Sequence, residues 1–107
     1  MMDLIKRLFG NKDLEVLKEV LRRKAFLVDV RSPEEFVSGS VVGAINIPLG
    51  TLPEQLEKFE GKDGIVVFCR SGMRSGQAKV ILEKAGHGNV VNGGAWQRVQ
   101  GALEESD

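Results

Sequence analysis

The sequence predicts an α/β domain in which helices cover both faces of a mainly parallel sheet. Short apolar runs rich in β-branched residues recur along the chain and are too short to be helices. Segments with helical spacing of apolar residues separate these runs, and such alternation is typical of crossover units that join parallel strands. The 107 residues are enough for one domain with one core and too few for two ordinary domains.

The first elements are a helix and a buried strand. Residues 3–24 are predicted to be helical, since apolar positions such as Leu17 and Leu21 recur at helical spacing. Asp13 is placed to cap the first turn of the DLEVLKEVLRRK portion. The run AFLVDV, residues 25–30, is short, apolar and flanked by charge, which indicates a buried strand.

A capping box opens the next helix. In SPEEF, Ser32 is the N-cap, Pro33 takes the first helical position and Glu35 lies three residues after the cap. A second short strand is predicted in AINIP, where Pro48 stops it. The segment TLPEQLEKF then predicts another helix, with Thr51 as its N-cap.

The second half of the chain continues the alternation. GIVVF, residues 64–68, predicts the third strand, and residues 75–85 predict a helix that Gly86 closes. Residues 89–91 predict the fourth strand, and GGAWQRVQGALEE predicts a final helix entered through its paired glycines. Ligands of parallel sheets bind at the carboxyl ends of strands. Three polar residues fall at such ends: Asp29, Cys69 and Asn92.

Composition excludes several classes of function. The chain is 42% hydrophobic and 28% charged, with a formal net charge of zero, so no electrostatic attraction to nucleic acid or to an anionic membrane is expected. One cysteine and one histidine exclude an internal disulfide and a Cys/His zinc cluster. No apolar run approaches the roughly 18 residues of a membrane span, and no signal-peptide core is present. We expect a cytoplasmic protein.

The loop after the third strand has the composition of a reactive thiol site. Cys69 ends the strand, and a helix is expected to begin near Ser75, so the amides between them can form an anion cradle at a helix N-terminus. Gly72 gives this loop the freedom to curl around the sulfur. Such an environment, with Arg70 and Arg74 nearby, lowers a thiol pKa from about 8.5 toward neutrality. The loop therefore predicts a nucleophilic thiolate in a positive pocket.

The loop sequence CRSGMRS also resembles the active loop of the rhodanese family. The pattern of that family is Cys-x-x-Gly-x-Arg-Ser/Thr. Other family landmarks follow in order: LVDVRSPEEF, GSVVGAINIPL, IVVFCRSGMRS and NVVNGGAW. The resemblance covers residues 25–96. It implies a three-layer rhodanese-like domain with four to five strands, in which residues 25–107 form the domain and residues 1–24 precede it as a helical segment. A family strand expected before LVDVR is replaced here by helical sequence, and Ser40 stands where the family often has a structural histidine.

The resemblance implies a sulfurtransferase of the thiosulfate sulfurtransferase type. Cys69 would accept a sulfane sulfur as a persulfide, and no metal or other cofactor is implied. The donor would be a small anion such as thiosulfate, oriented by Arg70 and Arg74, and the acceptor would be cyanide, a thiol or a protein. The implied donor-binding residues form one loop: Arg70, Ser71, Gly72, Met73, Arg74 and Ser75.

Two alternatives use the same cysteine. One is a rhodanese-like module that carries or senses persulfide for a partner protein. The other is a cysteine-based phosphatase or arsenate reductase. The phosphatase loop has five residues between Cys and Arg, whereas four separate Cys69 from Arg74 here, and the loop contains no Asp to act as a general acid. Sulfur transfer is favoured.

Several residues outside the loop invite a functional interpretation. Asp29 and Arg31 end a buried strand and are interpreted as supporting residues, with Arg31 paired to Glu35. His87 lies in a glycine-flanked turn at the opposite end of the sheet and is expected to be a surface turn residue rather than a general base. Trp96 is expected to pack near the active face, while Met73 is expected either to wall the pocket or to be exposed.

Overall fold

The computed structural model describes residues 11–105 as a four-stranded, fully parallel sheet. The strand order is β2-β1-β3-β4, which places β3 in the interior beside β1 and β4. The strands are β1 (Phe26–Asp29), β2 (Ile45–Asn46), β3 (Ile65–Cys69) and β4 (Val90–Ala95). Within the described residues the sheet thus has four strands, at the lower end of the predicted range.

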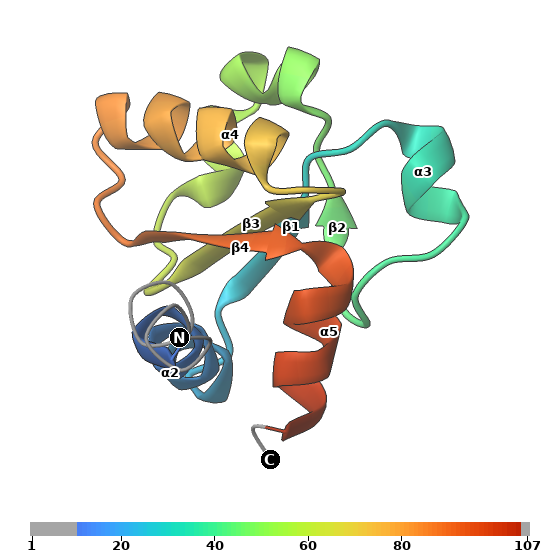
Figure 1. Cartoon of the computed structure of the whole chain (residues 1–107). Coiled ribbons are helices and arrows are strands. Elements are labelled where there is room, and N and C mark those ends of the chain that lie inside the picture. The colour runs from blue at the N-terminus through green and yellow to red at the C-terminus, as the bar shows by residue number, and fades with distance from the viewer. Residues whose placement is uncertain (1–10, 106–107) are drawn as a thin grey trace.

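Helices cover both faces of the sheet, as the sequence predicts (Figure 1). One face carries α4 (Met73–Lys84) and two short 3-10 helices, η1 (Leu49–Glu54) and η2 (Leu56–Phe59). The other face carries α2 (Asn11–Arg22) and α5 (Trp96–Glu105), which contact each other. The short helix α3 (Pro33–Val37) lies beside the ends of β1 and β2. No helix among residues 11–105 has the length and apolarity needed to cross a bilayer.

Alternation along β3 divides the core into two clusters and sets the direction of the cysteine. Ile65, Val67 and Cys69 belong to the cluster beneath α4, whereas Val66 and Phe68 belong to the cluster beneath α2 and α5. All five side chains are buried. Because odd-numbered positions face α4, the thiol is directed to the side from which the α4 N-terminus approaches the strand end.

The structure confirms most predicted elements and corrects their ends. The capping box is present, with Ser32 Oγ accepting from the Glu35 amide and the Glu35 carboxylate accepting from the Ser32 amide. The predicted helix 3–24 is observed from residue 11 to residue 22, and its earlier part lies outside the described residues. The strand at 89–91 extends to Ala95, so the two glycines expected to enter the last helix belong to β4.

The predicted helix at TLPEQLEKF is wrong in type and in its cap. The segment forms two 3-10 helices, η1 and η2, separated at Gln55. Pro53 lies inside η1 and has no amide to donate, which disfavours a continuous α-helix. Thr51 is not a cap: its hydroxyl donates backward to the carbonyl of Pro48 at 3.1 Å.

Candidate active site

The loop after β3 is short because one glycine makes the turn. Gly72 has φ 102°, in the left-handed region, and serves as the N-cap of α4. The helix therefore begins at Met73, two residues before the predicted start at Ser75. A Cβ on Gly72 would lie 3.4 Å from the Cα of Gly94 on β4, so the loop packs closely against that strand. The result is a tight ring of backbone between Cys69 and Ser75.

Amide and hydroxyl groups of this ring surround the sulfur. The Gly72 amide donates to Cys69 Sγ at 3.0 Å, and Ser75 Oγ lies 3.4 Å from the same atom. Burial raises the pKa of the Cys69 thiol, but hydrogen bonds from the Ser75 hydroxyl and from the amides of Ser75, Gly72 and Ser71 lower it by more. The pKa of Cys69 thus lies below its ordinary value, as expected for a nucleophilic cysteine.

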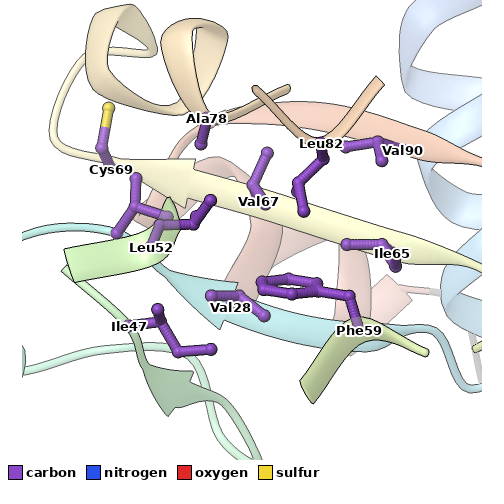
Figure 2. Close-up of a cluster of buried hydrophobic side chains, with 11 residues drawn as sticks. Val28, Ile47, Leu52, Phe59, Ile65, Val67, Cys69, Ala78, Leu82 and Val90 are labelled. Atoms are coloured by element: carbon purple, nitrogen blue, oxygen red, sulfur yellow. The ribbon is translucent and has the colours of Figure 1, made fainter. Parts of the chain in front are cut away.

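The thiol lies at the boundary between the core and the loop. Cys69 is 1% exposed and its carbon atoms join the apolar cluster beneath α4. Figure 2 shows its sulfur pointing away from the labelled apolar side chains, toward the turn that enters α4. Met73 is 76% exposed, which agrees with the second of its two predicted placements. A donor must therefore approach the sulfur from the side of the loop.

Arg74 is held by a carboxylate from a distant part of the chain. Its two terminal nitrogens donate to Glu35 Oε1 at 2.7 Å and Oε2 at 3.1 Å, linking α4 to α3. The Arg74 hydrogen bond, with further ones from Ser32, lowers the pKa of Glu35 from 4.5 to about 2. The same hydrogen bond raises the pKa of Arg74. Arg70 is exposed and has no ion-pair partner among residues 11–105.

The predicted ion pair between Arg31 and Glu35 is wrong, because Arg31 pairs with Asp29. The Arg31 side chain donates to Asp29 Oδ2 at 2.7 Å and to Asp29 Oδ1 at 3.0 Å, and both residues are buried. Ser40, at the family's histidine position, donates its hydroxyl to Asp29 at 2.7 Å. The guanidinium also lies 5.5 Å from the ring centre of Trp96. These contacts connect β1, the loop that follows it and the start of α5, and they hold these segments together beside the active loop.

Asn92 is the residue of the site whose role sequence reasoning missed. The position of Asn92 at the end of a strand was the signal in the sequence that it could belong to the site. In the structure, the Asn92 side chain has hydrogen-bond partners at two positions of the loop ring. Asn92 Oδ1 accepts from Ser75 Oγ at 2.7 Å, and Asn92 Nδ2 donates to the Gly72 carbonyl at 3.2 Å. His87, by contrast, is partly buried, with its ring 6.2 Å from that of Phe59, between α4 and the start of β4.

Comparison with known proteins agrees with this geometry. The thiosulfate sulfurtransferase PspE of Escherichia coli is 42% identical over 69 residues, which are 63% of this chain and 66% of PspE. A sulfurtransferase of Allochromatium vinosum is 38% identical over 76 residues, 67% of this chain and 71% of that protein. A solved structure described as rhodanese with anions, from E. coli, has a TM-score of 0.64 and 39% identity and covers 68% of this chain and 88% of its own.

A family model described as the rhodanese-like domain matches residues 13–99. The chain spans between 56% and 71% of the length of four curated relatives that it matches. The family match includes all four strands, the Cys69 loop and the capping box at Ser32. The chain belongs to the rhodanese-like domain family.

Proposed function

We propose that this protein is a sulfurtransferase that carries a sulfane sulfur on Cys69 as a persulfide. The observation that carries the proposal is the position of Cys69 Sγ, which accepts the Gly72 amide at 3.0 Å within a ring of loop amides. Two of its relatives are named as sulfurtransferases, one of them as a thiosulfate sulfurtransferase. Thiosulfate, or a similar small anion, is the proposed donor.

The proposed reaction has two displacement steps. The Cys69 thiolate attacks the outer sulfur of thiosulfate, a sulfur–sulfur bond forms, and sulfite leaves with the electron pair of the broken sulfur–sulfur bond. The terminal sulfur of the persulfide carries the negative charge, which the loop amides and the N-terminus of α4 stabilise. A second nucleophile, such as cyanide or a thiol, then takes the terminal sulfur and regenerates the thiolate. Because residues 1–107 contain one cysteine, no second thiol among them can take the sulfur, and the proposed acceptor lies outside these residues.

The two loop arginines take different parts in this proposal. Arg70 is exposed and can turn its guanidinium toward the sulfonate group of an arriving donor. Arg74 is bound to Glu35 through its two terminal nitrogens, so it offers the donor only the N–H groups that remain. We propose that Arg74 supplies a positive charge at a fixed place beside the site, and that Arg70 moves to contact the sulfonate group of the donor.

Intact mass measurement after incubation with thiosulfate tests the proposal. We expect the mass to increase by one sulfur atom in the wild type and to stay unchanged in Cys69→Ser, and cyanide is expected to remove the added sulfur as thiocyanate. A persulfide that cyanide does not release would favour a carrier module that serves a protein partner. If no sulfur is added and the protein hydrolyses a phosphate monoester, the sulfurtransferase proposal is refuted and the phosphatase alternative takes its place.

A further inference from the structure

Asn92 hydrogen-bonds to two of the residues that contact the sulfur. Its Oδ1 accepts the Ser75 hydroxyl at 2.7 Å, and its Nδ2 donates to the Gly72 carbonyl at 3.2 Å. The Ser75 hydroxyl and the Gly72 amide are in turn two of the groups that contact Cys69 Sγ. A single amide on β4 is therefore one hydrogen bond away from each of these two residues.

Two backbone groups fix which way this amide faces. The Gly94 amide can only donate, and it lies 3.0 Å from Asn92 Oδ1. The Gly72 carbonyl can only accept, and it lies 3.2 Å from Nδ2. A flipped side chain would place two donors together at Gly94 and two acceptors together at Gly72. The oxygen of Asn92 is therefore the atom that faces Ser75.

This orientation controls the single proton of the Ser75 hydroxyl. Facing Asn92 Oδ1, the hydroxyl must donate, so its oxygen can only accept from Cys69 while the cysteine is a protonated thiol. When the thiol ionises, the sulfur becomes an acceptor and the hydroxyl must turn toward it. Asn92 Oδ1 then keeps the Gly94 amide as its donor. Asn92 and the Cys69 thiolate thus compete for one proton.

An irregularity in the sheet lies directly after Asn92. Pairing between β3 and β4 shifts after Val67, which is opposite Asn92, so that Phe68 is opposite Gly94 and Gly93 is the extra residue. A Cβ on Gly93 would lie 2.5 Å from Val99 Cγ2, so no larger residue fits there without displacing α5. Regular alternation from Val90 directs Asn92 toward α4, and the bulge that follows lets the Gly94 amide reach back to the Asn92 oxygen.

We propose that Asn92 is a positioning residue for Cys69, because its amide sets the direction of the Ser75 hydroxyl and fixes the Gly72 peptide whose amide faces the sulfur. The inference rests on the proposed function only in taking Cys69 as the reacting atom. It concerns the ionisation of the thiol, which can be measured with no sulfur donor present. Failure of sulfur transfer and failure of this inference are therefore distinguishable.

The native charged groups around Cys69 and Asn92 stay the same in the variants that test this proposal, and Asn92→Asp adds one carboxylate to them. They are two ion pairs, three further cations and one further carboxylate: Asp29 with Arg31, Glu35 with Arg74, then Arg70, Lys79 and Arg98, and Asp13. Their fields act on the thiol equally in each variant. A difference between variants then reports the change at Asn92 itself.

The decisive variant is Asn92→Asp, compared in the wild-type and Ser75→Ala backgrounds. The carboxylate still accepts from Ser75 and Gly94 but attracts the hydroxyl proton more strongly, repels the thiolate and cannot donate to Gly72. All three changes raise the pKa of Cys69. We expect a rise of at least about one unit, hence about tenfold slower iodoacetamide alkylation at a fixed pH below the pKa. In Ser75→Ala the same substitution is expected to produce a smaller rise, because the competition for the hydroxyl proton is removed while the repulsion and the lost contact with Gly72 remain.

Asn89→Asp is the matched control. Asn89 also donates through its side chain to backbone carbonyls, those of Lys62 and Asp63, but it does so at the opposite end of β4. The pKa of Cys69 is expected to stay unchanged in this control. An unchanged pKa in Asn92→Asp, or an equal rise with and without the Ser75 hydroxyl, would overturn the proposal.

If Asn92→Asp does not fold, Asn92→Ala makes the same comparison. Without the oxygen of Asn92, the Ser75 hydroxyl can donate to the thiolate without giving up another hydrogen bond. Ser75→Ala is then expected to raise the pKa of Cys69 by more in the Asn92→Ala background than in the wild type. Equal effects in the two backgrounds would contradict the role assigned to Asn92.

Discussion

Replacing Gly72 by alanine tests whether the loop amide stabilises the thiolate. Gly72 has φ 102°, and a left-handed conformation costs an alanine about 1–2 kcal/mol. We expect relaxation of this strain to turn the Gly72 peptide, since the Cβ would lie in contact with Gly94 Cα, at 3.4 Å, and leaves the residue little room to shift as a whole. A hydrogen bond to a charged group is worth about 1.5–3 kcal/mol, or about one to two pKa units. Losing half of the free energy of this hydrogen bond would raise the pKa of Cys69 by about 0.5–1 unit.

Gly86→Ala is the matched control for this substitution. Gly86 has φ 100°, nearly the same conformation, and a Cβ there would have no atom within 4 Å. Urea denaturation is expected to give both variants a similar loss of stability of about 1–2 kcal/mol. Only Gly72→Ala is expected to shift the pH dependence of Cys69 alkylation. Equal loss of stability with an unshifted pH profile would refute the claim that the Gly72 amide holds the thiolate.

Three further substitutions test the ion pairs and the anion site. Asp29→Ala is expected to cost about 3–5 kcal/mol in urea denaturation, because it leaves the buried Arg31 unpaired, and a curve like that of the wild type would contradict this. Glu35 has a folded pKa of about 2 against an ordinary 4.5, so its contribution to stability is complete above about pH 4.5 and is lost as the pH falls toward 2. Glu35→Gln is therefore expected to be less stable than the wild type near neutrality and to converge with it in acid; a difference that does not shrink would exclude this linkage. Arg74→Ala is expected to raise the thiosulfate concentration needed for half-maximal persulfide formation while leaving alkylation at high pH nearly unchanged, and an unaltered thiosulfate dependence would rule out an anion-orienting role.

Local patterns in the sequence were sufficient for most of the fold. Buried strands of parallel sheets are short apolar runs, so residues 25–30 and 64–68 could be identified as β1 and β3 without knowledge of their neighbours. The capping box at Ser32 was equally local, since both of its hydrogen bonds join residues three apart. The prediction of an α-helix at 51–59 was wrong because Pro53 interrupts a pattern that otherwise has helical spacing.

The partners within the site depend on tertiary packing and were less predictable. Arg74 and Glu35 are 39 residues apart, and their contact follows from the placement of α3 beside the N-terminus of α4. Asn92 faces α4 by the regular alternation of β4, but its contacts with Ser75 and Gly72 follow from the packing of α4 and its loop against this strand, which local periodicity does not indicate. The loop itself was identifiable because its cysteine, glycine and arginines are contiguous in the sequence.

The ionisation of Cys69 is the central claim, and an ultraviolet titration of the thiolate measures it directly. The chain has one cysteine and no tyrosine, so the rise in thiolate absorbance with pH belongs to Cys69 without overlap from phenolate. We predict a midpoint clearly below the value of about 8.5 for an unperturbed cysteine, and no such transition in Cys69→Ser. A midpoint at or above about 8.5 would mean that burial outweighs the loop hydrogen bonds and would contradict the account.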